Sequence, residues 1–232
     1  MQDYTYSDIA GMIDHSLLNP SLTTQDLEEG CTLALRYQVA SVCIMPFALR
    51  RCADFLTGSA VKASTTIGFP HGGHTTAIKI AEARQALADG GQELDVVINI
   101  SKAVSGDWRY VGTELAALTD VVHSSGARIK VIFENAYLDE PGKIRLCQMC
   151  GEFGVDWVKT STGYAPGGAT MADLELMRRC SPPNVQVKAA GGIRDLDTLL
   201  GIRAIGVSRV GATRTQSMLE ECRRRLDLDP IP

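Results

Sequence analysis

Short apolar segments alternate with longer amphipathic segments along almost the whole chain. The short segments end at Gly, Pro or Asn and are typical of strands buried on both faces. The longer segments carry apolar residues at the three- and four-residue spacing of a helix. The expected strands are 12–17, 41–45, 62–69, 94–100, 129–134, 157–161, 185–190 and 207–211, and the clearest expected helices are 24–37, 75–89, 107–124, 140–153 and 171–180.

About eight strands that alternate with helices predict an α/β fold, the (β/α)8 TIM barrel, as a single domain over residues 1–232. A doubly wound open sheet is the competing architecture. It usually carries a glycine-rich phosphate loop after its first strand, and residues 12–20 contain no G-x-G-x-x-G. We therefore expect a barrel, with its chemistry at the carboxyl ends of the strands.

Composition narrows the class of protein. A formal net charge of −4 argues against nucleic acid or an anionic membrane as a partner, because both require a basic face. No apolar run of about 18 residues and no signal-peptide pattern is present, so we expect a cytoplasmic protein. Seven cysteines, an odd number scattered through core-like segments, are expected as reduced thiols.

Two expected strands each contain a lysine, Lys159 and Lys188, which is an unusual residue for a buried strand. If both point inward, their ammonium groups enter one barrel from adjacent strands about 4.8 Å apart. The alternative is that both point outward and extend their charged ends to water between the helices. Because a barrel interior disfavours an unpaired charge, two such lysines favour a functional role.

A second cation beside a buried lysine lowers the pKa of that lysine, because burial and like-charge repulsion both disfavour the charged form. A neutral amine is then available near pH 7 to attack a carbonyl. Asp95 supplies a carboxylate within an otherwise apolar strand, although a strand-start residue that caps a turn is the alternative. Asp14, in the first expected strand, is a weaker candidate for the same role, with the same alternative.

Glycines end the last three strands just before the helices that follow. Their backbone N–H groups and the helix N-termini could bind a phosphate, with charge-assisted contacts from arginine. Simple turn glycines are the alternative. The candidate anion-binding residues are Thr162, Gly163, Gly191, Gly192, Arg194, Gly211, Thr213 and Arg214.

Three other signals carry less weight. Cys147 and Cys150 match C-x-x-C, but they lie within a helical pattern without a second pair, so core thiols are favoured over a zinc or redox site. His71 and His74 lack a cluster of further ligands, which favours a plain loop over a metal site. Cys43 is expected as a small buried residue. We therefore expect no metal site.

A series of motifs resembles the deoxyribose-phosphate aldolase family in the same order and over nearly the whole chain. The Lys-Thr-Ser-Thr-Gly and Lys-Ala-Ala-Gly-Gly blocks are the most specific. The matching segments are Asp14-His15-Ser16-Leu17-Leu18, Val42-Cys43-Ile44, Gly68-Phe69-Pro70-His71-Gly72, Glu93-Leu94-Asp95-Val96-Val97-Ile98-Asn99, Lys130-Val131-Ile132-Phe133-Glu134, Val158-Lys159-Thr160-Ser161-Thr162-Gly163 and Lys188-Ala189-Ala190-Gly191-Gly192-Ile193-Arg194.

The resemblance implies a class I aldolase in which Lys159 forms a Schiff base, Lys188 tunes its pKa and Asp95 relays protons through an ordered water. It also implies reversible cleavage of 2-deoxy-D-ribose 5-phosphate to acetaldehyde and D-glyceraldehyde 3-phosphate, and Asp14 is expected among the substrate-binding residues. No metal or cofactor is expected.

Three segments depart from the family pattern. Gly211-Ala212-Thr213-Arg214 stands where many members have a serine-bearing phosphate loop, Tyr164 stands where phenylalanine or lysine is familiar, and Phe133-Glu134-Asn135-Ala136 differs from the usual Glu-Thr block. These departures bear on substrate choice more than on the covalent chemistry.

Two rival functions stay open, together with a Schiff-base aldolase for another small sugar phosphate or acid. One is a barrel isomerase or epimerase that uses acid–base chemistry without a covalent intermediate. The other is a catalytically silent barrel that senses a sugar phosphate. A homodimer is left open as the assembly.

Overall fold

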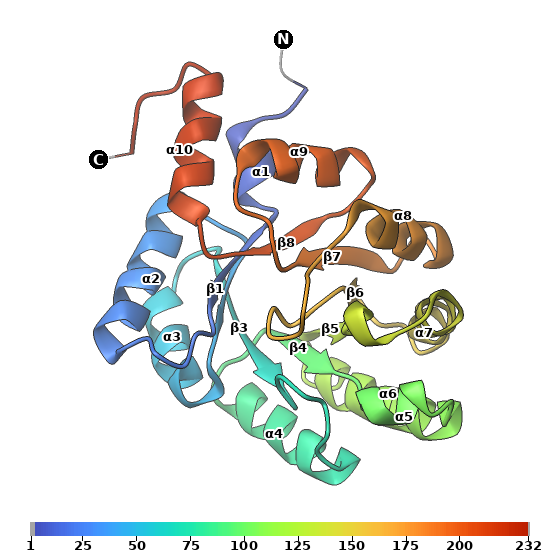
Figure 1. Cartoon of the computed structure of the whole chain (residues 1–232). Coiled ribbons are helices and arrows are strands. Elements are labelled where there is room, and N and C mark those ends of the chain that lie inside the picture. Colours follow the sequence, from blue (N-terminus) through green and yellow to red (C-terminus); the bar gives the residue numbers. More distant parts are fainter. Residues whose placement is uncertain (1–2, 232) are drawn as a thin grey trace.

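The computed structural model describes residues 3–231, and the remaining three residues of the predicted 1–232 domain lie outside the described part. Within it, eight parallel strands pair in chain order, and β1 also pairs with β8, so the sheet closes into a barrel (Figure 1). The predicted TIM barrel is confirmed. The strands are β1 (Ile13–Leu17), β2 (Ser41–Ile44), β3 (Lys62–Ile67), β4 (Glu93–Val97), β5 (Arg128–Ile132), β6 (Trp157–Lys159), β7 (Gln186–Ala190) and β8 (Arg209–Ala212).

Helices surround the barrel and connect its strands (Figure 1). The five helices named from the sequence are present, with ends that differ by one residue at most. Within the described residues, no helix is both long and apolar enough to cross a membrane. The helices are α1 (Tyr6–Ala10), α2 (Thr24–Tyr37), α3 (Leu49–Leu56), α4 (Thr76–Ala88), α5 (Ile100–Val104), α6 (Trp108–His123), α7 (Glu140–Glu152), α8 (Met171–Cys180), α9 (Leu196–Ala204) and α10 (Thr215–Arg225), with short 3-10 turns η1 (Pro46–Ala48) and η2 (Asn135–Tyr137).

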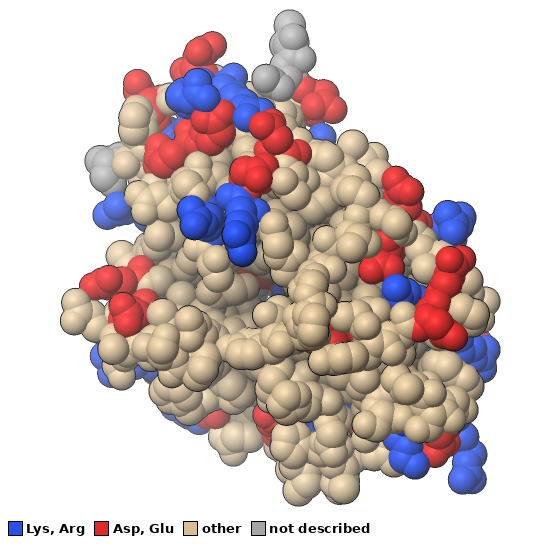
Figure 2. Space-filling model, in the orientation of Figure 1, with Lys and Arg blue, Asp and Glu red and all other residues tan. Residues whose placement is uncertain are grey.

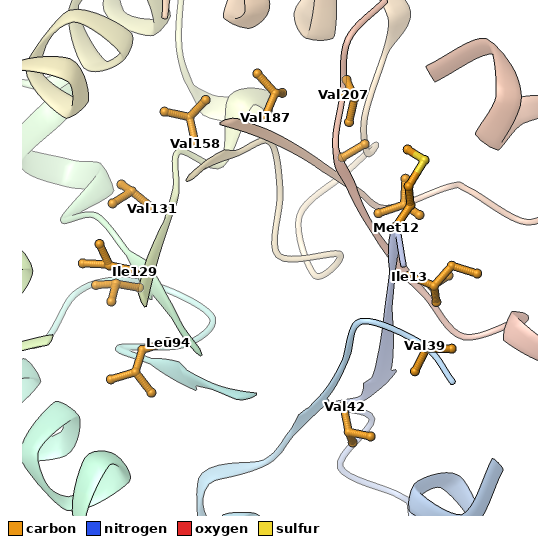
Figure 3. Close-up of a cluster of buried hydrophobic side chains, with 14 of the residues drawn as sticks. Met12, Ile13, Val39, Val42, Leu94, Ile129, Val131, Val158, Val187 and Val207 are labelled. Carbon is orange, nitrogen blue, oxygen red and sulfur yellow. The ribbon is translucent and has the colours of Figure 1, made fainter. Parts of the chain in front are cut away.

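The apolar core lies between the strands and the helices. Figure 3 shows side chains such as Ile13, Leu94 and Val158 on the outer side of the strands, and all three are fully buried. Alternate residues of the same strands therefore point into the barrel. The interior is unusually polar, because its buried residues include Asp14, Ser41, Ser64, Glu93, Asp95, Lys130, Lys159, Lys188 and Arg209.

The fourth strand ends earlier than the sequence pattern predicted. Residues 94–100 were expected as strand, but β4 ends at Val97. The Lys79 ammonium donates to the Val97 carbonyl at 2.8 Å, and the Glu114 carboxylate accepts from the Asn99 backbone N–H at 3.0 Å. These contacts draw the chain away from the sheet, so that Asn99 becomes the N-cap of α5. The ends of the other expected strands differ by at most two residues from those observed.

Candidate active site

Lys159 and Lys188 lie side by side inside the barrel. They are register partners on β6 and β7 and are 3 % and 1 % exposed. Their ammonium groups share one carboxylate oxygen of Asp95 on β4, at 2.6 Å from Lys159 and 2.7 Å from Lys188. The structure thus brings together the three residues predicted to be catalytic, and the outward orientation considered for the lysines does not occur.

Three further charged residues join this site, and the sequence patterns gave none of them a role. The Lys130 ammonium on β5 lies 2.6 Å from the Glu93 carboxylate and 3.0 Å from that of Asp95. Arg209 on β8 lies 2.6 Å from Asp14 and 3.0 Å from Glu93. For Lys130 a signal was present, since a lysine again interrupts an apolar strand.

Asp14 belongs to the same network. Its carboxylate lies 2.5 Å from the Lys188 ammonium and accepts a 2.6 Å hydrogen bond from the Ser41 hydroxyl. It is fully buried, and every contact recorded for its oxygens is to a cation or a hydroxyl of the barrel interior. The structure therefore places Asp14 within the charge network, whereas its predicted contact with substrate stays a prediction.

We call these linked residues the ion cluster. Its members are Asp14, Glu93, Asp95, Lys130, Lys159, Lys188 and Arg209. The cluster contains three carboxylates and four basic groups. Three cations neutralise three carboxylates, so the fourth basic group would carry a surplus buried charge, which is strongly disfavoured.

The direction of each pKa shift identifies the surplus group. Burial lowers the pKa of Lys159, and the charge of Lys188 lowers it further against the opposing effect of Asp95. Burial also disfavours charge on Lys130 and Lys188, but there the neighbouring carboxylates prevail and raise the pKa of each. Lys159 is thus the lysine of the cluster that loses its proton most readily.

Trp157 covers the cluster towards the amino ends of the strands. Its ring lies 5.0 Å from the Arg209 guanidinium and 5.7 Å from the Lys130 ammonium, and its indole N–H donates to Ser208 at 3.1 Å. The negative face of an indole stabilises nearby cations. Trp157 therefore helps to keep these two groups charged.

The residues that follow Lys159 form a loop, 160–170, which we call the mouth loop. It leads from β6 to α8 across the front of the barrel (Figure 1). The Thr162 backbone N–H and hydroxyl both donate to the Glu134 carboxylate. Glu134 has a left-handed φ of 56°, which is uncommon for a residue with a side chain, and it aims this buried carboxylate at the mouth loop.

The other end of the mouth loop packs directly against the end of β7. The Ala169 N–H donates to the Gly191 carbonyl at 3.1 Å. A Cβ atom on Gly168 would lie 2.5 Å from that carbonyl oxygen, which is closer than real Cβ contacts allow. Gly191 itself has a left-handed φ of 85°. Glycine at these two positions lets the backbones meet.

Tyr164 links the mouth loop to two other strand ends. Its hydroxyl donates to the Leu18 carbonyl after β1 at 2.8 Å, and its ring packs edge-on against Phe69 after β3 at 5.4 Å. Together these contacts hold the loop over the barrel mouth. A pocket of about 460 Å³ beside the loop is lined by residues that include Pro70, His71, Glu134, Tyr137, Thr162 and Tyr164.

The predicted anion-binding residues lie at the carboxyl ends of β6, β7 and β8. Gly163, Gly192, Arg194, Thr213 and Arg214 are exposed, whereas Gly191 and Gly211 are half-buried and Thr162 is buried. Figure 2 shows a group of Lys or Arg side chains over the loop between β8 and α10, beside a hollow in this face. A Cβ on Gly211 would contact Lys188, so the glycine leaves room next to that lysine.

The remaining candidates lie apart from this chemistry or are buried. Cys147 and Cys150 are both buried in α7, and Cys43 is buried on β2, where burial raises its pKa. All seven cysteines are free. His71 and His74 are exposed, and among residues 3–231 no group of three or more His, Cys, Asp or Glu side chains is arranged to hold a metal ion.

Comparison with known proteins supplies the family. Residues 9–210 match the model of the DeoC/LacD family aldolases. A protein of Rhodopirellula baltica named deoxyribose-phosphate aldolase is 62% identical over 231 residues, which cover 100% of this chain and 96% of that protein.

Two solved structures share the fold. An aldolase named QR15 has a TM-score of 0.89 at 35% identity, and the match covers 96% of this chain and 99% of that one. A deoxyribose phosphate aldolase from Aeropyrum pernix, described as tetrameric, has a TM-score of 0.87 at 28% identity over 94% of this chain and 92% of that one. The resemblance seen in the motifs is confirmed, and the chain belongs to the DeoC/LacD family of aldolases, which are lyases.

Proposed function

We propose that this aldolase reversibly cleaves 2-deoxy-D-ribose 5-phosphate to acetaldehyde and D-glyceraldehyde 3-phosphate through a Schiff base at Lys159. The name of the Rhodopirellula baltica relative supports the substrate. The observation that carries the mechanism is the composition of the ion cluster, in which Lys159 is the surplus basic group beside three permanent cations.

The neutral amine of Lys159 attacks the C1 aldehyde of the open-chain sugar, and loss of water gives an iminium. The C3 hydroxyl then loses its proton, the C2–C3 bond breaks, and the electron pair flows to the iminium to form an enamine as glyceraldehyde 3-phosphate leaves. Protonation at C2 and hydrolysis release acetaldehyde and restore the amine.

The cluster also favours the bond-breaking step. An iminium at Lys159 adds the surplus positive charge that the cluster does not neutralise, and the enamine removes it again. The low-dielectric interior therefore stabilises the enamine relative to the iminium. Asp95 contacts the Lys159 nitrogen, and Lys188 binds the same oxygen of Asp95. We assign proton transfer to Asp95 through water and the tuning of Lys159 to Lys188.

Borohydride trapping tests the covalent step. Incubation with acetaldehyde and borohydride should add an ethyl group to Lys159, and mass spectrometry of a digest would locate it. Lys159→Leu is the matched variant and should lose both label and activity. Labelling of surface lysines only, with activity retained in Lys159→Leu, would point to an isomerase-type mechanism without a covalent intermediate. We also expect activity to survive EDTA.

The anionic end of the substrate is proposed to bind at Gly191, Gly192 and Gly211 with Arg214. A guanidinium grips a phosphate through a two-pronged hydrogen bond, whereas the serine familiar at this loop offers one hydroxyl. Arg194 and Thr213 lie on the same strand ends, and their contact with the anion is proposed on that ground.

Arg214→Ser should raise the KM for the phosphorylated substrate by about tenfold or more, as expected for a lost charge-assisted pair, and change kcat much less. Cleavage of unphosphorylated deoxyribose is the control and should barely change. Equal effects on both substrates would mean that Arg214 supports the fold. No effect on either would leave it a solvated residue.

We propose the cytoplasm as the compartment and a homodimer as the assembly. Free cysteines suit a reducing compartment. Light scattering should give twice the 25.0 kDa of one chain, whereas four copies would match the tetramer described for Aeropyrum pernix.

A further inference from the structure

Glu93 and Arg209 lie one layer deeper in the barrel than the reacting lysine. Glu93 precedes Asp95 by two residues on β4, and Arg209 precedes Gly211 by two residues on β8, so both point inward nearer the amino ends of the strands. Substrate is expected from the carboxyl ends, where active sites of TIM barrels lie. Neither residue is therefore placed to touch substrate.

Both residues are nonetheless connected to Lys159 by a chain of ion pairs. Arg209 contacts Asp14 at 2.6 Å, and Asp14 contacts Lys188 at 2.5 Å. Lys188 in turn shares an oxygen of Asp95 with Lys159. A change in the charge of the deep layer must be compensated largely within this cluster, because Arg209 and Glu93 are buried and little water is left to screen the charge.

We propose that Arg209 and Glu93 are positioning residues that set the charge balance of the ion cluster and thereby keep Lys159 a neutral amine. This inference rests on the proposed function, since it concerns the same nucleophile. Removal of Arg209 leaves three carboxylates with two permanent cations, and the proton of Lys159 then supplies the missing charge. Removal of Glu93 has the opposite effect, because a cation of the cluster becomes surplus.

The other groups near Lys159 do not provide this balance. The thiol of Cys43 on β2 is uncharged when burial raises its pKa, and β3 contributes only hydroxyls, such as those of Ser64 and Thr66. Glu134 is buried after β5, but its recorded contacts are to Thr162 on the mouth loop and not to a lysine. The charged groups that act on Lys159 directly are Asp95 and Lys188, and these two are contacted in turn by Lys130 and Asp14, so all four are members of the cluster.

Arg209 contacts carboxylates from two different strands, which supports its role as a counter-ion of the cluster. Its guanidinium holds Asp14 from β1 and Glu93 from β4 and lies over the Trp157 ring from β6. These contacts raise its pKa further above the already high value of arginine, although burial opposes them. Arg209 thus stays charged at every pH at which the enzyme works, as a permanent counter-ion must.

The pH dependence of trapping at Lys159 tests the proposal. The ethylated fraction of Lys159 after acetaldehyde and borohydride is measured by mass spectrometry from about pH 5 to 9 in the wild type, Arg209→Gln, Glu93→Gln and the double variant. The ethylated fraction should fall on the acidic side, where Lys159 becomes protonated, and we call this part of the curve the acidic limb. Lys159 lies two strands from Arg209, about 10 Å away, so the acidic limb should move by about one pH unit per removed charge.

The expected shifts have opposite signs. The limb should move to higher pH in Arg209→Gln, to lower pH in Glu93→Gln, and back towards the wild-type position in the double variant. A purely structural role would reduce trapping without moving the limb, or would move it in the same direction in both variants, and either result overturns the proposal. Arg209→Lys retains the charge and should keep the limb in place.

These measurements test the Schiff base at Lys159 and the charge balance set by Arg209 and Glu93 separately. Failure to trap Lys159 in the wild type would overturn the Schiff base itself, whereas normal trapping with an unmoved limb in the variants would overturn only the charge balance. If Arg209→Gln does not fold, Glu93→Gln alone still decides, because a limb that stays fixed or rises in it contradicts the inference.

Discussion

Lys159 and Lys130 are both buried lysines of the same cluster, but their surroundings differ. The Lys130 ammonium lies within 3.4 Å of three carboxylates, those of Asp14, Glu93 and Asp95. Lys159 has one carboxylate partner, Asp95, and shares its oxygen with Lys188. One lysine is therefore an essential counter-ion, and the other is the surplus base.

This difference predicts opposite outcomes for the same substitution. Lys159→Met should abolish aldol cleavage but leave the thermal midpoint unchanged or higher, because three cations still neutralise three carboxylates and a lowered lysine pKa destabilises the folded chain below pH 10. Activity assays and calorimetry on the purified variant provide the measurement.

Lys130→Met is the matched control. It removes a counter-ion and leaves buried carboxylates short of one charge, which should cost about 3–5 kcal/mol of unfolding free energy in urea titrations. Equal destabilisation by both substitutions would contradict the division of roles within the cluster.

Residues of the ion cluster could be identified from the sequence only where a charged residue interrupts an apolar strand. Lys159, Lys188 and Asp95 stood out for that reason. Glu93 and Arg209 are separated by 116 positions in the sequence, and only closure of the barrel brings them to 3.0 Å. A charge near the start of a strand is an ordinary feature, so no local pattern indicated that these two form a pair.

The mouth loop shows how an element is fixed by contacts at both of its ends. Gly168→Ala would place a Cβ atom 2.5 Å from the Gly191 carbonyl oxygen, and backbone on both sides cannot rotate away as a side chain can. The loop must shift, at a cost of about 1–3 kcal/mol typical of overpacking. We expect this loss in urea titrations, together with a fall in kcat/KM, because the loop continues directly from Lys159.

Gly73→Ala is the control for this loop substitution. Gly73 is exposed, and a Cβ there would have no heavy atom within 4 Å. It should change stability by no more than about 0.5 kcal/mol. A Gly168→Ala variant as stable and active as Gly73→Ala would show that the mouth loop tolerates displacement.

Element positions could be predicted from periodicity, whereas element ends depended on distant partners. The apolar run to residue 100 indicated a strand throughout, yet the buried Lys79–Glu114 pair takes up backbone groups of Val97 and Asn99. That pair joins α4 to α6, and no strand pattern predicts it. The short helix α5 was missed because its first residue, Ile100, extended the apolar run.

At the scale of the whole molecule, apolar packing and charge occupy separate shells. The outer faces of the strands pack on the helices, and the barrel interior holds the ion cluster between Trp157 and the mouth loop. Charged residues inside a core require mutual neutralisation. Stability of the whole barrel should therefore follow the protonation of the cluster.

The dependence of stability on pH follows from the directions of the pKa shifts. Burial alone would raise the pKa of Asp14 and Asp95, but the surrounding cations prevail and hold both below the usual value, about 3.9. Groups with a depressed pKa contribute stability above that value and lose it as the pH falls through the folded-state pKa. Lys130 and Lys188 have raised pKa values, so their contribution persists below about pH 10.4 and is lost above it.

We therefore expect a steep loss of stability below about pH 4. Lys159 adds a shallower rise of stability with pH, from its lowered folded-state pKa to about pH 10.4, because the unfolded chain there binds one more proton at this lysine than the folded chain does. Each of the two aspartates adds about 1.4 kcal/mol per pH unit to the slope below about pH 4. Urea midpoints at pH 7, 4 and 3 would measure it, with a repeat at high salt as the control, because salt screens exposed charges but reaches a buried cluster poorly. A midpoint that stays level down to pH 3, or a loss that high salt abolishes, would place the acid sensitivity on the surface of the molecule and not in the ion cluster.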